Sequence, residues 1–258
     1  MRIIISPAKK MRVDTDTLPW KDLPCMIDKA EVLYGKLRSM SYGELKKLWG
    51  CSDAIAEQNL ERLKTSDLRT RLTPAILSYE GIQYRYMAPG VFTRKELDYV
   101  QTHLRILSGL YGVLRPFDGV TPYRLEMQAK LKIGNVKDLY SYWGETLAEN
   151  LWRESDCVVN LASREYGDCV SHYPRSGKQL IGCVFGEEMD GRIVEKGTLC
   201  KMARGEMVRY LAEIGAQNPE ELKGFDRLNY VFSPKHSTPE RYVFILSKSC
   251  GKPGSCEA

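Results

Sequence analysis

The sequence lacks the long hydrophobic runs that a membrane-spanning or secreted chain would carry. Its longest apolar runs, such as residues 242–246, have the length of a strand, whereas a membrane-spanning helix needs roughly 20 apolar residues. The N-terminal segment MRIIISPAKK has only three consecutive isoleucines after its first arginine, and a secretory signal needs about 7–15 apolar residues. We therefore expect a cytoplasmic protein that has no membrane partner.

Residues spaced for metal binding are also scarce. The eight cysteines form no CxxC pair, and the three histidines (His103, His172 and His236) lie far apart without HxxxH spacing. We expect mostly buried, reduced thiols, no metal and no cofactor. Two alternatives stay open: carboxylates alone could hold iron, and Cys250 and Cys256 could serve a redox role.

The composition is that of a globular protein with a sizeable core, because 43% of the residues are hydrophobic and 28% are charged. The formal net charge of +5 permits binding to phosphate-rich partners, although the distribution of charge decides this more than the total. No linker rich in Pro, Gly or Ser divides the chain. We expect a single domain over residues 1–248, followed by a loose C-terminal tail at 249–258.

Helical and strand patterns mix along the chain without regular alternation. Strands are expected at 2–6, 157–161, 180–185, 192–194 and 242–246, and helices at 26–40, 42–48, 53–63, 95–107 and 200–214. Ser41 and Glu44 have the spacing of a capping box, and Asp190-Gly191 is typical of a hairpin turn. This order predicts a mixed α/β (α+β) fold, in which a mixed sheet is wrapped by helices.

Positive residues follow the first expected strand in the segment SPAKK. Lys9 and Lys10 lie there, near Arg2 and Arg12 and before any acidic residue. Residues that leave the end of a strand commonly line a cleft. The segment therefore predicts a phosphate contact, and a solvated turn is the alternative.

The most unusual segment is LSGLYGVLRPFDGVTPYRLEM, residues 107–127. Its glycines, prolines and aromatic residues suit a rigid loop better than a regular element. Arg115 and Arg124 could form forked contacts with phosphate or carboxylate oxygens. Asp118 and Glu126 could instead neutralise these arginines in a buried structural network, and both interpretations stay open.

Two further segments place polar residues where a ligand could bind. In NLASREY, Asn160, Ser163 and Glu165 come where an apolar strand ends, and ligands gather at the carboxyl ends of strands in open α/β sheets. In KMARGEM, Lys201 and Arg204 have helical i, i+3 spacing. The alternatives are a Ser163 that merely caps a helix and a cationic helix face in solvent.

Residues 42–64 resemble a helix-hairpin-helix element, in which the turn presents backbone N–H groups to a DNA phosphate. Gly50 fits the first glycine of that pattern, Ser52 stands at the second, and Ala54 replaces a usual lysine. Such contacts position a protein on DNA and do not read sequence. An ordinary αα-hairpin is the alternative.

Four of these segments together resemble the YaaA family of bacterial peroxide-stress proteins. SPAKK, residues 107–127, NLASREY and KMARGEM occur in the family's order and spacing, from residue 3 to about residue 246. Lys10 stands where the family usually has threonine, and the cysteine-containing tail has no counterpart. The resemblance implies a mixed α/β domain with a positively charged cleft, DNA binding through a helix-hairpin-helix element, and a role in limiting damage by hydrogen peroxide, linked to low free iron.

Two functions follow as hypotheses. The first is a DNA-binding protein of the peroxide response whose partner is double-stranded DNA bound without sequence specificity. Its phosphate-binding candidates are Lys9, Lys10, Gly50, Ser52, Arg115, Arg124, Lys201 and Arg204. The second is an enzyme acting on a nucleobase, nucleotide or damaged DNA, because carboxylates beside phosphate-binding cations suit acid–base chemistry. Its catalytic candidates are Asp118, Glu126, Asn160 and Glu165.

Overall fold

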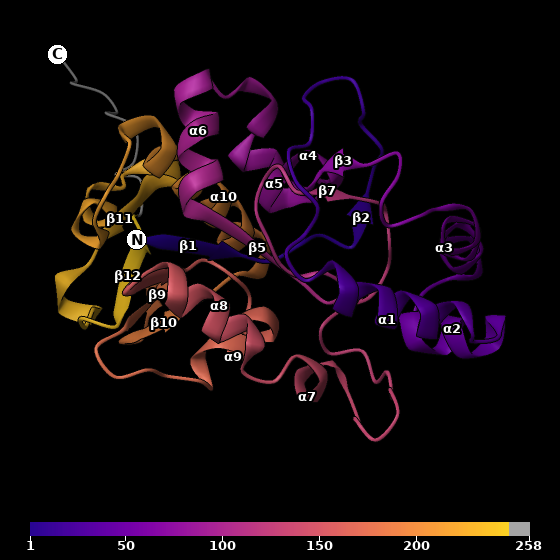
Figure 1. Cartoon of the computed structure of the whole chain (residues 1–258). Helices are drawn as coiled ribbons and strands as arrows, with labels where there is room; N and C mark the ends of the chain where they lie inside the picture. The colour runs from indigo at the N-terminus through magenta and orange to yellow at the C-terminus, as the bar shows by residue number, and fades with distance from the viewer. Residues whose placement is uncertain (248–258) are drawn as a thin grey trace, which may run out of the picture.

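A mixed β-sheet forms the centre of the protein in a computed structural model that describes residues 1–247 (Figure 1). Across the sheet the strands follow the order β11 (Tyr230–Phe232), β12 (Arg241–Leu246), β9 (Gln179–Met189), β8 (Cys157–Asn160), β1 (Arg2–Ile5), β5 (Leu104–Ser108) and β6 (Gly112–Leu114). The strands from β12 to β5 are parallel to one another, and β11, β6 and β10 (Arg192–Val194, paired with β9) are antiparallel to their neighbours. The predicted mixed sheet is confirmed.

Two short antiparallel pairs tie loops to this sheet. β2 (Lys10–Met11) pairs with β4 (Tyr79–Glu80), and β3 (Thr73–Pro74) pairs with β7 (Gly119–Val120). The first pair fixes the chain that leaves β1. The second fixes the middle of the long segment at residues 107–127.

Helices cover both sides of the sheet. They are α1 (Ile27–Arg38), α2 (Tyr42–Trp49), α3 (Asp53–Thr65), α4 (Ala75–Ser78), α5 (Ile82–Met87), α6 (Arg94–His103), α7 (Leu139–Trp143), α8 (Thr146–Glu154), α9 (Arg164–Ser171) and α10 (Gly197–Ile214). In Figure 1, α5, α6 and α10 lie above β1, α8 and α9 lie below it, and α1 to α3 form a separate cluster to one side. Within residues 1–247 no helix combines the length and apolarity needed to cross a membrane.

The core lies around the parallel strands. Ile3, Ile4 and Ile5 of β1 are all buried, which is why this strand is a continuous apolar run and not an alternating one. The expected hairpin is confirmed: Asp190 and Gly191 join β9 to β10 with φ values of 49° and 74°, as a tight hairpin turn requires.

The helix predicted over 95–107 is wrong in its second half. α6 ends at His103, and Leu104–Ser108 is the buried strand β5, which pairs with β1 in parallel. Leu97, Val100, Leu104 and Leu107 have helical spacing, but a short apolar run fits a buried strand equally well. The pairing with β1, a long-range contact, decides between the two.

Residues 42–64 form two helices joined by a short turn. The predicted capping box is confirmed, because Ser41 and Glu44 exchange hydrogen bonds at the start of α2. Gly50 ends α2 in the left-handed region with φ 52°, and Ser52 is the N-terminal cap residue of α3. The DNA-binding identity of this hairpin stays a prediction. The predicted tail at 249–258, with Cys250 and Cys256, lies outside the described residues.

Candidate functional site

The segments after β1 and β8 meet because the two strands are parallel neighbours. Ile4 is in register with Asn160, so Ser6 and Ser163 both leave the carboxyl edge of the sheet, where ligands commonly bind. The backbone N–H of Ser163 donates to Ser6 Oγ at 2.8 Å, and the Ser6 hydroxyl donates to Ser163 Oγ at 3.1 Å. These bonds lock SPAKK against NLASREY.

All four family-like motifs contribute to one cavity of about 440 Å³ at this edge. We call it the motif cavity. Its lining residues are Ser6, Pro7, Ala8, Lys9, Lys10, Glu80, Gly81, Ile82, Gln83, Tyr84, Tyr123, Arg124, Leu125, Glu126, Ser163, Glu165, Tyr166, Lys201 and Arg204. Segments separated by more than a hundred residues therefore build a single site.

Gly109 places the wall formed by Leu125 and Glu126. A Cβ on Gly109 would lie 2.4 Å from the carbonyl oxygen of Leu125, so only glycine allows this approach. Next to it, the hydroxyls of Ser108 and Tyr123 lie 2.6 Å apart in a hydrogen bond. The glycine in LSGLY thus holds the end of the same segment against β5.

Gly205 lets α10 pack closely on α5, and α10 carries Lys201 and Arg204 of the cavity lining. α10 packs on α5 so closely that a Cβ on Gly205 would lie 2.2 Å from the carbonyl oxygen of Gln83 and 2.9 Å from the backbone nitrogen of Met87. Both contacts are with backbone, which cannot move aside as a flexible side chain could.

Gly205→Ala is expected to lower the free energy of unfolding by about 1–3 kcal/mol, because the added methyl group forces α5 and α10 apart. Gly197→Ala is the matched control, since a Cβ on Gly197 in the first turn of α10 would meet nothing within 4 Å. Urea denaturation measures both. Equal stabilities of the two variants would contradict the close packing of α5 on α10.

The motif cavity has more positive than negative side chains. Five cations line it, against three carboxylates. Lys9 Nζ lies 2.8 Å from Glu126 Oε2, and Lys10 Nζ lies 2.9 Å from Glu80 Oε2. These lysines are exposed at the rim, with 64% and 77% of their side chains accessible, so their ion pairs are weak and screened by salt.

The two arginines of the cavity are mostly buried and poorly paired. The side chains of Arg124 and Arg204 are 11% and 16% exposed. Within residues 1–247, the Nε atoms of both have no hydrogen-bond partner. Arg124 donates to the carbonyl oxygen of Trp49 at 3.3 Å and lies 3.2 Å from Glu126 Oε1. Arg204 lies 3.8 Å from Glu195 Oε1.

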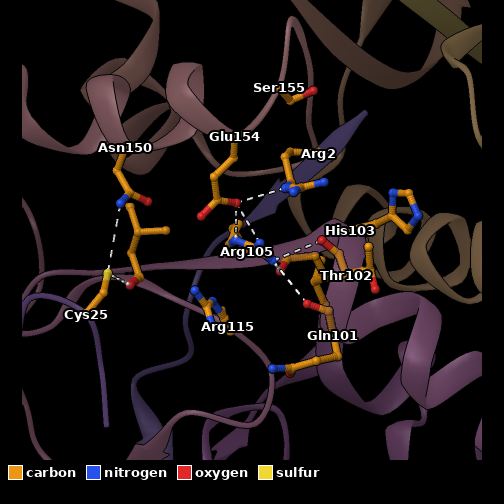
Figure 2. A network of polar contacts seen from close by, with 12 residues as sticks. Arg2, Cys25, Gln101, Thr102, His103, Arg105, Arg115, Asn150, Glu154 and Ser155 are labelled. Carbon is orange, nitrogen blue, oxygen red and sulfur yellow. Dashed lines mark hydrogen bonds and ion pairs between the residues drawn. The ribbon is translucent and has the colours of Figure 1, made fainter. Parts of the chain in front are cut away.

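Arg105 shows how this protein satisfies an arginine that has a structural role (Figure 2). Its Nε and Nη2 donate to Glu154 at 2.9 and 2.6 Å, and its Nη1 donates to three backbone carbonyls. Arg2 donates to the same carboxylate. Buried charged donors without partners are unfavourable, and, within residues 1–247, the Nε atoms of Arg124 and Arg204 lack the partners that Arg105 has.

Glu165 is the carboxylate in the cavity with a perturbed titration. Burial raises the pKa of Glu165 above its usual range, and the carboxylate of Glu126 acts in the same direction, while the N–H of Gln128 opposes it by donating to Oε1 at 3.1 Å. A carboxyl group that holds its proton more tightly suits general acid–base work.

Apart from Gly50 and Ser52 of the predicted hairpin, three predicted site residues do not line the motif cavity. Asp118 is 2% exposed and accepts a hydrogen bond from the backbone N–H of Arg115 at 2.8 Å. Arg115 lies near the network of Arg105 (Figure 2). Its Nη1 lies 3.8 Å from Oδ2 of Asp22. Asn160 accepts from the N–H of Ala162 at 2.9 Å and therefore shapes the loop after β8.

Several cavity residues were not among the predicted site residues. Ser6, Tyr123 and Tyr166 belong to the motifs themselves, so their sequence context marked them. Glu80 comes from β4 and Tyr84 from α5, and the sequence of these elements has no distinctive pattern. Tyr84 donates to the backbone carbonyl of Ser6 at 2.9 Å, a contact that only the tertiary structure reveals.

A second hollow of about 720 Å³ leads from the cavity to the turn between α2 and α3. We call it the hairpin groove. Its lining residues are Lys9, Met40, Glu44, Lys47, Leu48, Trp49, Gly50, Arg124, Glu126, Gln128, Ala129 and Lys130. Lys9, Arg124 and Glu126 line both hollows. The predicted hairpin and the four motifs therefore border one continuous surface, although Ser52 lines neither hollow.

The motif order predicts a family, and comparison with known proteins decides it. A family model described as peroxide stress protein YaaA matches residues 1–236. The chain belongs to the YaaA family. The resemblance that the four motifs predicted is therefore confirmed.

Among the described residues, no group of three or more His, Cys, Asp or Glu side chains is placed to hold a metal ion.

Curated relatives of the YaaA-family chain carry the name UPF0246 protein. One from Agathobacter rectalis is 52% identical over 244 residues, covering 95% of this chain and 98% of the relative. Relatives from Lachnoclostridium phytofermentans and Pediococcus pentosaceus are each 50% identical, covering 96% of this chain and 98% and 99% of their own lengths. The likeness thus extends over nearly the whole chain.

Proposed function

We propose that this member of the YaaA family binds double-stranded DNA without sequence specificity during the response to hydrogen peroxide. Two mostly buried arginines support this most strongly: Arg124 lines both the motif cavity and the hairpin groove, Arg204 lines the motif cavity, and the Nε atoms of both lack a hydrogen-bond partner within residues 1–247. Guanidinium groups suit phosphate oxygens because of their forked donors. The protein would act in the cytoplasm and limit iron-dependent DNA damage; the family's name supports the part of this role that concerns peroxide stress.

The arrangement of the lysines also favours a phosphate backbone. Lys47 and Lys130 border the hairpin groove, and Lys9, Lys10 and Lys201 border the motif cavity. Exposed lysines on one continuous surface can neutralise successive phosphates without reading bases. The N-terminal end of α3 adds orphan N–H groups near the same groove.

A salt titration of wild-type protein with a fluorescent duplex tests DNA binding. If two to five phosphates are neutralised, the logarithm of the binding constant should fall with the logarithm of salt concentration with a slope between about −2 and −4.5. Unrelated duplex sequences should give affinities within a few-fold of one another. Undetectable binding at about 50 mM salt, or a slope near zero, would contradict the proposal.

Protection from damage can be tested separately from binding. Saturating protein should reduce the nicking of plasmid DNA by ferrous iron and peroxide. The variant that links the two properties is Lys10→Glu together with Lys201→Glu. It reverses the charge of the cavity rim and should weaken DNA binding and protection together. Protection that persists in this variant at concentrations where binding is lost would show that DNA coverage is not its cause.

An enzymatic role is the second candidate, because Glu165 combines a raised pKa with a place in the cavity beside Glu126. On this reading the protein acts on a nucleobase, nucleotide or damaged DNA. Glu165→Gln should abolish turnover of such a substrate while duplex affinity changes little, and Asp168→Asn on the same helix is the control. No turnover by wild type over a broad panel of damaged duplexes and nucleosides would remove this candidate.

A further inference from the structure

The motif cavity is too small for a duplex but suitable for one nucleotide. Ligand pockets for small molecules commonly have volumes of about 300–1,000 Å³, and this cavity has about 440 Å³. The unpaired Nε atoms of Arg124 and Arg204 are buried. A group that satisfies them must therefore enter the cavity, whereas the exposed lysines can be reached from the surface.

The unpaired polar atoms call for a ligand that both accepts and donates hydrogen bonds. Arg124 and Arg204 offer unpaired donors, and Glu126 Oε1 is a buried acceptor without a hydrogen-bond partner in the described chain. Oε1 lies 3.2 Å from Arg124 Nη2 as an ion pair, but that approach lacks hydrogen-bond geometry. A phosphodiester group of DNA supplies acceptors only. A phosphate joined to a base that carries N–H groups supplies both.

The rest of the wall suits an aromatic ring. Tyr84, Tyr123 and Tyr166 line the cavity together with the apolar side chains of Pro7, Ala8, Ile82 and Leu125. The hydroxyl of Tyr84 is bound to the carbonyl of Ser6, and that of Tyr123 to Ser108, so both rings are held in place. Base–aromatic contacts stabilise binding by about 1–3 kcal/mol per base.

We propose that the motif cavity binds a single nucleotide unit, with its phosphate at Arg124 and Arg204 and its base among the tyrosines. The unit has two potential sources: a nucleotide extruded from bound DNA, or a free mononucleotide. The first source rests on the proposed DNA binding, and the second does not. Extrusion fits the hairpin groove, because DNA held there would lie beside the cavity that shares Lys9, Arg124 and Glu126 with it.

A duplex containing one 2-aminopurine tests the first source. Extrusion unstacks the base, so wild-type protein should raise its fluorescence several-fold. Ala8→Trp fills the cavity from its smallest apolar side chain and should abolish the rise even at protein concentrations that saturate the duplex by anisotropy, which remain attainable because the exposed lysines still bind phosphates. Val231→Trp is the control and should behave as wild type, because Val231 lies on β11, is 54% exposed and lines neither hollow. Thermal unfolding checks that each variant is folded.

Calorimetry with free deoxyadenosine monophosphate, inorganic phosphate and deoxyadenosine tests the second source. The mononucleotide should bind about tenfold or more tightly than either part alone, because the base contact adds to the phosphate contact, and Ala8→Trp should remove this preference. A rise in fluorescence identifies DNA as the source, and mononucleotide preference without a rise identifies the free nucleotide.

The proposal is overturned if fluorescence does not rise on a duplex that binds and the mononucleotide binds no better than phosphate, since the site is then a simple anion site. A fluorescence rise and a mononucleotide preference that both survive Ala8→Trp overturn it as well. If wild type binds no duplex at all, the proposed DNA binding fails, and calorimetry still decides whether the cavity takes a nucleotide.

Discussion

Replacing Arg124 and Arg204 together by glutamine is expected to weaken duplex binding by roughly 10²- to 10⁴-fold. Within residues 1–247 the buried Nε–H of each guanidinium has no partner, and both side chains are mostly buried. A hydrogen bond involving a charged group contributes about 1.5–3 kcal/mol. Glutamine removes the charge and most of the donors. Fluorescence anisotropy at about 100 mM salt measures the loss, and the slope against salt should become shallower by about two.

The matched control is Arg209→Gln. Arg209 lies on α10 as Arg204 does, but pairs with Glu213 at 2.8 Å in an i, i+4 arrangement and does not line either hollow. Its replacement removes the same charge from the same helix and should change duplex affinity by only a few-fold. A loss as large as that of the double variant would mean that overall charge, and not the motif cavity, determines binding.

Asp118→Asn is expected to change how stability depends on pH. Burial raises the pKa of Asp118 from 3.8 to about 7. The backbone N–H of Arg115 and the positive charges of Arg115 and Arg105 act to lower this pKa, and the negative charge of Asp22 acts to raise it. A carboxyl whose pKa is higher in the folded state contributes stability below its unfolded pKa, and this contribution is lost as pH rises through the folded pKa. Wild type should therefore lose on the order of 2–4 kcal/mol between about pH 4 and pH 8 through this group.

The asparagine variant keeps an oxygen to accept the N–H of Arg115 but cannot ionise. It should match wild type near pH 4 and exceed it in stability at pH 8. Asp118→Ala also removes ionisation but leaves that buried N–H unpaired, so it should be less stable than Asp118→Asn at every pH. Urea denaturation at several pH values measures all three. A constant difference between wild type and Asp118→Asn would contradict the raised pKa.

The central motif at residues 107–127 reverses direction between β5 and β6, and this reversal explains why the sequence predicted only part of the site. β5 runs toward the cavity edge, and β6 runs back in the antiparallel direction, with Ser108 in register with Gly112 and Ile106 with Leu114. Arg115 and Asp118 follow β6 and so lie at the opposite edge: Arg115 is near Arg105 (Figure 2), and Asp118 accepts from the backbone N–H of Arg115. The chain then returns through β7 to the cavity. Sequence spacing within one motif does not reveal such a reversal.

The segments that follow parallel strands were easier to interpret. SPAKK and NLASREY each begin where an apolar run ends, and adjacent parallel strands bring their ends together. Lys201 and Arg204 were recognisable as a helical pair. Their position beside the other motifs depends on the close packing of Gly205 on α5. The two segments in this contact are more than a hundred residues apart in the sequence. The run at 104–108 could not be assigned from the sequence for the same reason: its pairing with β1, a long-range contact, makes it a strand.

NMR of the arginine side chains tests whether Arg124 and Arg204 bind DNA. The Nε–H signals of Arg124, Arg204 and Arg105 can be observed in one titration with duplex. We expect the signals of Arg124 and Arg204 to shift and saturate with DNA, because both donors lack partners in the free protein. The signal of Arg105 should stay in place, because its donors are already bound to Glu154. Saturable binding of duplex that leaves the signals of Arg124 and Arg204 unmoved would contradict the account.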